Sequence, residues 1–193
     1  MKSANMHRLG RSGRRTLASL LMGFVALVAI LPAAIATEGA EPVNAVFEGR
    51  LIDLSTDWED AQACMVWREV GVVECFRTEK AMDARIAELE GELDSAKTMT
   101  ASGTCSGYMR LYKNSGYGGQ VLYLRGRLQW TNLSGYSFSN ETSSFKIGPC
   151  SAYLADGSLG GGSWYPTSQS QAWDVAPNMA TGWNDRISSV YIK

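Results

Sequence analysis

The sequence predicts a mainly β protein, in which a β-sandwich or barrel made of two similar units follows a small α+β segment with one longer helix. Apolar and polar residues alternate over 109–112, 120–125 and 190–192, and turn-forming residues separate these runs at short intervals. The stretch 143–147 returns as 188–192, 45 residues later. Because each unit is too small to bury its own apolar face, we expect the two to pack into one domain over residues 104–193.

The N-terminal region has the pattern of an export signal. Residues 1–16 carry five basic side chains and no acid, and an uncharged apolar run over 17–36 ends in Ala34, Ile35 and Ala36. This pattern predicts a signal peptide over 1–36, a secreted protein, and no stable membrane span after cleavage. An uncleaved anchor stays open as an alternative, because twenty apolar residues suffice to span a bilayer. Pro32 and the small residues at the end favour cleavage.

Residues 37–98 are expected to form the small α+β segment. The predicted elements are a strand over 47–54, a short helix from Ser55 or Asp57 toward Cys64, a hairpin over 64–75, and a helix from an N-cap at Thr78 to about Ala96. The apolar positions of the longer helix are Met82, Ile86, Leu89 and Leu93. This stripe spans only two heptads, so we interpret it as a helix that packs on its own small module rather than as a coiled coil. Small polar residues predict a linker at 99–103.

All four cysteines lie after the predicted signal, which favours two disulfides in an oxidising compartment. Counting outward from a turn at residues 69–71 places Cys64 opposite Cys75, within disulfide reach. Cys105 would then pair with Cys150. The CxxC spacing of redox and zinc motifs is not present, which argues against catalytic thiols.

Composition disfavours several classes of function. The single histidine, His7, lies in the predicted signal, so the mature chain cannot form a Ser-His-Asp or Cys-His system or a His-ligated zinc site. We therefore expect a protein that is not an enzyme. Residues 37–100 hold fifteen acids and six bases, whereas 101–193 hold four acids and seven bases. No cationic stripe for phosphates is evident, so no nucleic-acid partner is expected.

Two short patterns recur in the β region. The first is an aromatic, four residues, a second aromatic, one residue and a glycine, with Tyr112, Tyr117 and Gly119 in these places. The second unit repeats it with Tyr153 and Gly160 but has a serine as its second aromatic position. The second pattern, two Asn/Asp, two variable residues, Ser/Thr and Ser, is complete in NDRISS at 184–189 and lacks only its first position in SNETSS at 139–144.

Both patterns are similar to signatures of the βγ-crystallin family. The resemblance covers residues 104–193 and implies a double Greek-key β-sandwich. In that family the glycine of the first pattern takes a positive φ, and the last serine of the second packs against the folded hairpin. The resemblance therefore implies structural roles for Ser144 and Ser189.

A calcium site also follows from the resemblance. The implied ligands are Asp185, the carbonyl of Arg186 and Ser188, together with Asn140, the carbonyl of Glu141 and Ser143. Oxygen ligands suit Ca²⁺, but few of these are charged, so binding in the range of about 10⁻⁴–10⁻³ M is expected. The alternative, that these residues only cap turns and bind no ion, stays open.

Among secreted proteins of this type, the chain resembles the bacterial metalloproteinase-inhibitor family. The likeness rests on the export signal, on Cys105 ahead of the first unit, on the hairpin that follows it, and on Cys150 opening the second unit. It implies a secreted protease as partner, held by a rigid substrate-like loop. Within the irregular stretch 156–169, Trp164 and Tyr165 are the predicted partner-binding residues, although Trp164 could equally belong to the core.

A glycan-binding or structural module, attached to a cell-wall or cell surface and stabilised by Ca²⁺, is the alternative function. Four of the six tryptophans lie in the β region, and aromatic faces can stack on sugars. Of these, Trp130 and Trp183 are expected in the core. A glycosidase is disfavoured, because the β region offers only four carboxylates and two of them belong to the calcium patterns.

Overall fold

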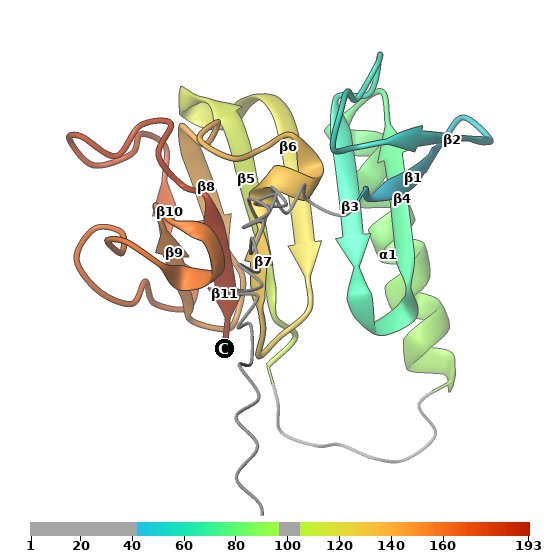
Figure 1. Ribbon diagram of the computed structural model, residues 1–193. Coiled ribbons are helices and arrows are strands. Elements are labelled where there is room, and N and C mark those ends of the chain that lie inside the picture. Colours follow the sequence, from blue (N-terminus) through green and yellow to red (C-terminus); the bar gives the residue numbers. More distant parts are fainter. Residues whose placement is uncertain (1–41, 97–104) are drawn as a thin grey trace, which may run out of the picture. The chain divides into compact units, whose positions relative to one another are not determined.

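The computed structural model describes residues 42–96 and 105–193 (Figure 1). The predicted signal peptide at 1–36 and linker at 99–103 lie outside these residues. The strands are β1 Asn44–Phe47, β2 Arg50–Asp53, β3 Ala63–Trp67, β4 Val72–Phe76, β5 Tyr108–Asn114, β6 Gly118–Arg125, β7 Trp130–Asn132, β8 Ser144–Ile147, β9 Ala152–Ala155, β10 Val175–Ala176 and β11 Ser189–Ile192. The α-helix is α1 Glu79–Ala96, and the short 3-10 turns are η1 Arg68–Val70, η2 Ser115–Tyr117, η3 Leu133–Tyr136 and η4 Ser158–Gly160. No helix in the described part is both long and apolar enough to span a membrane.

The β region is a double Greek key of the βγ-crystallin type, as predicted. Its first unit is β5, β6, β7 and β8, and its second is β9, the segment 164–170, β10 and β11. One sheet contains the order β10-β8-β5-β6 and the other the order β7-β11-β9. Each unit therefore gives one strand, β7 or β10, to the sheet of the other. In Figure 1 the three-stranded sheet lies in front of the first.

The core of this sandwich lies between the two sheets. The inward residues Met109, Leu111 and Leu122 of one sheet form a single buried cluster with Leu154 and Val190 of the other. These residues alternate with outward ones along their strands, which is the pattern that a half-buried strand requires. Burial of both inner faces therefore positions the loops and the outer faces described below.

The N-terminal segment begins with a hairpin, not with the single strand predicted over 47–54. β1 and β2 pair in antiparallel register, with Phe47 opposite Arg50. Glu48 and Gly49 between them both have positive φ, 50° and 80°. This is the backbone of a tight two-residue hairpin turn, and glycine adopts it at little cost.

The short helix predicted from Ser55 or Asp57 to Cys64 does not form. The Asp53 carboxylate accepts hydrogen bonds from the backbone N–H and the hydroxyl of Ser55, which favours a turn over a helix. The chain then buries Trp58, whose indole N–H donates to the carbonyl of Tyr136 at 2.8 Å. β3 follows directly at Ala63.

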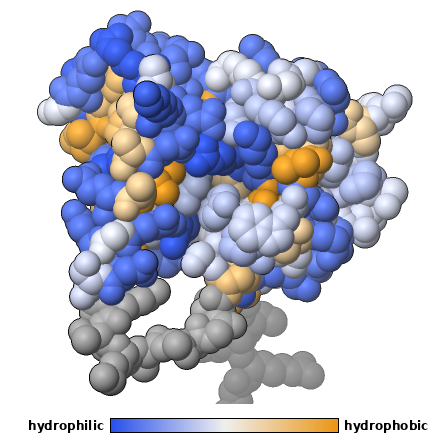
Figure 2. Space-filling model, turned by 180° about the vertical axis from the view of Figure 1, so that it is seen from behind, coloured by the Kyte–Doolittle hydropathy of each residue, from blue (hydrophilic) through white to orange (hydrophobic). Residues whose placement is uncertain are grey.

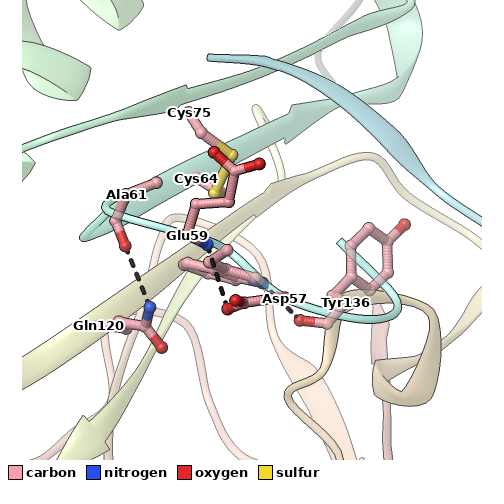
Figure 3. Close-up of a disulfide and its surroundings, with 8 residues drawn as sticks. Asp57, Glu59, Ala61, Cys64, Cys75, Gln120 and Tyr136 are labelled. Carbon is pink, nitrogen blue, oxygen red and sulfur yellow. Dashed lines mark hydrogen bonds between the residues drawn. A yellow bond between two sulfur atoms is a disulfide. The ribbon is translucent and has the colours of Figure 1, made fainter. Parts of the chain in front are cut away.

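Residues 42–96, which we call the acidic segment, continue the sheet of the β region. β3 pairs in parallel with β6, from Ala63 opposite Val121 to Trp67 opposite Arg125. The sheet thereby reaches eight strands, in the order β10-β8-β5-β6-β3-β4-β1-β2. In addition, the amide N–H of Gln120 donates to the carbonyl of Ala61 at 3.0 Å (Figure 3).

The helix is confirmed over 79–96, and Thr78 caps it by accepting a hydrogen bond from the N–H of Ala81. Its apolar stripe is buried or partly buried, also as predicted. However, it does not pack on its own module alone. Met82, Ile86 and Leu89 share a core cluster with Tyr112, Val121 and Tyr123 of β5 and β6, together with Ala63, Met65 and Trp67 of β3. The helix therefore covers a face to which both parts of the chain contribute.

Both predicted disulfides are confirmed. Cys64 and Cys75 are opposite residues of the β3–β4 hairpin, with their Cα atoms 4.1 Å apart (Figure 3). Cys105 is joined to Cys150, 45 residues away, and so ties the entry of the first Greek-key unit to the entry of the second.

Candidate functional site

The folded hairpins of the two units are built alike. Gly119 and Gly160 both have positive φ, 72° and 81°, as the family pattern implies. The hydroxyl of Ser144 donates to the carbonyl of Asn114 and accepts from the N–H of Tyr117. The hydroxyl of Ser189 donates to the carbonyl of Gly157 and accepts from the N–H of Gly160, in the second hairpin. The structural roles expected for Ser144 and Ser189 are thus confirmed.

The two six-residue motifs meet across the sandwich in a reciprocal arrangement. The Ser143 hydroxyl of the first motif donates to the Asp185 carboxylate of the second at 2.9 Å. In return, the Ser188 hydroxyl of the second donates to the side-chain oxygen of Asn140 in the first, also at 2.9 Å. Asn140 and Asp185 have φ values of 60° and 53°. Asn and Asp tolerate this left-handed conformation better than other non-glycine residues, which explains their place in the motif.

The donor chemistry of this arrangement fits a hard cation, with little charge. The cross-motif pairs contain hydroxyl, amide and carboxylate oxygens, which are ligands that Ca²⁺ accepts. Asp185 is the one carboxylate in these pairs. The side-chain carboxylate of Glu141 lies 3.5 Å from the Lys113 ammonium instead. Within the described ranges there is no group of three or more His, Cys, Asp or Glu side chains that could hold a metal. Nothing in the geometry places the carbonyls of Glu141 and Arg186 in a finished coordination shell.

A cluster of four aromatic side chains lies on the outer face of the three-stranded sheet. Tyr191 of β11 is directly opposite Trp130 of β7 on one side and Tyr153 of β9 on the other. Their inward neighbours Val190 and Leu154 are buried, so the three rings face outward. Trp164, which pairs with Ala155 at the end of β9, completes the set. We call Trp130, Tyr153, Trp164 and Tyr191 the aromatic platform.

The platform is preorganised and accessible. Its ring centroids lie 4.7–6.4 Å apart, with Tyr153 and Trp164 the closest pair. The indole N–H of Trp164 donates to the carbonyl of Gly160 at 2.8 Å, which fixes the plane of that ring while 38% of the residue stays exposed. The four rings and Lys193 line a pocket of about 210 Å³.

The two predicted partner-binding residues differ in their exposure to solvent. Trp164 is at the surface, whereas Tyr165 is only 8% exposed, packs against Phe145 and Trp183, and accepts a hydrogen bond from the N–H of Ala180. Tyr165 is therefore a core residue, and its prediction as a surface anchor is wrong. Adjacent residues in an extended segment point to opposite sides, which accounts for the difference.

The other tryptophans also divide. Trp183 is in the core as expected, but Trp130 is not, because its strand position faces outward and its ring is half-buried in the platform. Trp173 is 64% exposed and lies outside the platform. The alternation of the run 190–192 already places Tyr191 on the face opposite Val190 and Ile192, so this signal could have indicated the platform.

The stretch 156–169 is folded back on itself. The Asp156 N–H donates to the Ser163 carbonyl, and the Ser163 N–H donates to the Asp156 carboxylate. Arg186 also pairs with Asp156. The first half of this stretch is thus a closed hairpin, not an extended loop.

On the face of the molecule seen in Figure 2, hydrophobic residues occur only as small separate spots among hydrophilic ones.

Charged groups at the helix–sheet contact have perturbed pKa values. Arg110 of β5 pairs with Glu79 at 2.5 Å and with Asp83 at 2.6 Å, and these carboxylates of α1 outweigh burial and raise the pKa of its guanidinium. Burial raises the pKa of the Tyr112 hydroxyl, which also donates to Glu79. Burial also raises the pKa of Tyr123 to about 12. The contacts of Arg110 and Tyr112 with Glu79 and Asp83 therefore join the helix to the sheet.

Comparisons with known proteins find similar solved structures over less than half of the chain. No family model matches, and no curated protein does either. A βγ-crystallin domain from a study of the evolution of this eye-lens fold is 20% identical, with a TM-score of 0.41, covering 49% of this chain and 93% of that one. A βγ-crystallin from Ciona intestinalis (20% identity, TM-score 0.36) matches 45% of this chain and all of its own length. A βγ-crystallin domain from Flavobacterium johnsoniae is 23% identical, with a TM-score of 0.35, and the match covers 44% of this chain and 92% of that one.

Proposed function

We propose that the protein is an exported, non-catalytic binding protein whose β domain holds glycans on the aromatic platform. The observation that carries this proposal is the platform itself: four aromatic side chains, fixed by strand pairing, on an outer sheet face. An aromatic face is electron-rich, and the C–H face of a sugar ring is apolar and slightly positive, so the two stack favourably. The pocket of about 210 Å³ is smaller than the range typical of drug-sized ligands and suits one sugar unit of a chain.

Two further features support the glycan proposal: a ring that is fixed before binding, and disulfides that suit an extracellular location. The Trp164 ring is held by its hydrogen bond to Gly160 and by its contact with Tyr153, so little side-chain freedom is lost when a ligand binds. Both disulfides suit an oxidising, extracellular compartment, where glycans are abundant ligands. The export signal predicted over 1–36 is consistent with that location.

The experiment is affinity electrophoresis of the protein through gels that contain soluble polysaccharides, both neutral and acidic. Trp164→Ala removes a platform ring and is expected to weaken retention at least tenfold, since truncation of a tryptophan that anchors a partner costs about 2 kcal/mol and about 1.4 kcal/mol is a factor of ten. Trp173→Ala is the matched control, because it deletes an exposed tryptophan outside the platform. Equal retention of the two variants, or no retention of the wild type on any polysaccharide, would reject the proposal. Thermal melting of each variant checks that the fold is intact.

Calcium is a second element of the proposal. The cross-motif pairs Ser143–Asp185 and Ser188–Asn140 gather oxygen donors at two points, and bound Ca²⁺ would link the two Greek-key units there. The expected result is a higher Tm with millimolar Ca²⁺ than with chelator. Asp185→Ala should abolish the difference, whereas Asp174→Ala, outside the motifs, should keep it. An unchanged Tm in the wild type would leave the motifs with a turn-capping role alone.

The peptidase-inhibitor function implied by the family resemblance has less support. The stretch 156–169, which holds the predicted partner-binding residues, is closed by the hydrogen bonds of Asp156 with Ser163, and Tyr165 is buried. A substrate-like loop must instead present an extended backbone to the protease. The function stays a prediction, and stoichiometric inhibition of a thermolysin-like protease by the purified protein would support it over the glycan proposal.

A further inference from the structure

The edge of the aromatic platform carries one basic side chain, that of Lys193. The Lys193 ammonium lines the pocket and lies 5.6 Å from the centroid of the Tyr153 ring. In the described part of the chain, it makes no ion pair. The other residues that line the pocket are the four aromatic ones, so no acidic side chain faces it there.

The position of this ammonium is set by the fold. The backbone N–H of Lys193 donates to the Ser151 carbonyl at 2.9 Å, and its carbonyl accepts a hydrogen bond from Arg127. The ammonium itself donates to the side-chain oxygen of Gln169 at 2.8 Å. An ammonium has three N–H donors, so two remain for a ligand. A donor pair beside aromatic rings is well placed for an anionic group on a sugar that stacks on Tyr153 or Trp164.

Other basic side chains of the β region are already paired with carboxylates. These pairs are Arg110 with Glu79 and Asp83, Lys113 with Glu141, Arg125 with Glu90, and Arg186 with Asp156. The Lys193 ammonium has no such partner among the described residues, so an acidic glycan would pair with it, whereas a neutral glycan would not.

We propose that the ligand of the aromatic platform is an acidic glycan, whose carboxylate or sulfate group is bound by the Lys193 ammonium while its sugar ring stacks on the platform. This inference rests on the proposed glycan-binding function and adds the chemical class of the ligand. Carboxylate and sulfate share the anionic oxygen chemistry that an ammonium recognises, and the probes below separate them.

The test uses matched pairs of polysaccharides that differ only in charge. Polygalacturonate is compared with its methyl ester, and dextran sulfate with dextran, by affinity electrophoresis of the purified protein at low ionic strength. The wild type is expected to bind at least one charged form about three- to fivefold more tightly than its neutral partner, as for a partly exposed ion pair. The preference should shrink at 0.5 M salt. Retention on polygalacturonate assigns the carboxylate, and retention on dextran sulfate alone assigns the sulfate.

Lys193→Gln should abolish the preference, because glutamine carries no charge to pair with the anionic group. Lys80→Gln, which removes an exposed lysine of α1, is the matched control and should keep the preference. Equal binding of charged and neutral forms by the wild type would overturn the inference but not the glycan-binding function. Equal behaviour of the two lysine variants, or undiminished polyanion binding by Trp164→Ala, would also overturn it, because either indicates general charge attraction. No binding to any probe would reject both proposals.

Discussion

Asn140 and Asp185 show how single residues decide the geometry at the junction of the two Greek-key units. Each sits at a positive φ that few side chains accept, and each receives a hydroxyl from the opposite motif. The local conformation and the cross-motif contact therefore depend on the same residue. An alanine at either position would lose both, since alanine disfavours that backbone conformation and has no oxygen to accept the bond.

Thr142, between these motif residues, is the exception to good hydrogen bonding in the core. Its hydroxyl is fully buried and has no hydrogen-bond partner among the described residues. Thr142→Val keeps the shape and removes the unpaired group, so we expect the free energy of unfolding to rise by about 1 kcal/mol. Denaturant unfolding measures the change. As a control, Ser144→Ala deletes a hydroxyl with two hydrogen bonds and should lower the free energy of unfolding by about 1–2 kcal/mol. A destabilised Thr142→Val would show that the Thr142 hydroxyl has a hydrogen-bond partner.

Residue patterns also show where sequence reasoning stops. The positive φ at Gly119 and Gly160 and the roles of Ser144 and Ser189 could be predicted, because the resemblance to the βγ-crystallin patterns implies them. The burial of Tyr165 beside the exposed Trp164 could not, because it depends on which side of an irregular segment meets the core.

The contact of α1 with the sheet depends on buried polar groups as well as on its apolar stripe. Tyr112 and Tyr123 share a core cluster with the helix. Glu79 and Asp83 of the helix pair with Arg110, and Glu79 also accepts a hydrogen bond from the Tyr112 hydroxyl. The helix itself was predictable from its capping threonine and its stripe. The strands on which it packs could not be predicted, because the stripe indicates that one face of the helix is buried but not which strands cover that face.

The pH dependence of stability should report on this contact. Burial raises the pKa of Tyr123 from an unfolded value of about 10 to about 12. The stabilisation is therefore fully present below pH 10 and is lost as the pH rises toward 12, because the unfolded chain releases the proton first. We expect Tm to fall over that window, and Tyr123→Phe to make the fall shallower. Parallel curves for the two proteins would show that Tyr123 does not ionise on unfolding.

At the scale of the whole molecule, the acidic segment completes the β domain. β3 pairs with β6, which would otherwise be an edge strand, and α1 covers Tyr112, Val121 and Tyr123 on the sheet. The opposite charges of the two parts were visible in the sequence. Their joining was not, because parallel pairing of β3 with a strand about fifty residues later leaves no local signal.

A truncated protein tests this dependence. Residues 105–193 alone would expose the apolar face under α1 and the backbone groups of β6. We expect this fragment to melt at least about 10 °C below the full protein, since 1 kcal/mol shifts the Tm of a domain of this size by roughly 4–8 °C. It should also bind a dye that reports exposed apolar surface. A fragment with the Tm of the full protein would show that the acidic segment contributes nothing to the stability of the sandwich.

The pairing of β3 with β6 also sets an order of events as the chain is made. Synthesis proceeds from the N-terminus, so β3 and β4 emerge well before β6. The hairpin can close locally, because Cys64 and Cys75 are only 11 residues apart. The second edge of β3 must wait, with Met65 and Trp67 uncovered, until residue 125 is available. During that interval a nascent chain has an open, partly apolar strand edge, and the shared core can form only after most of the chain has left the ribosome.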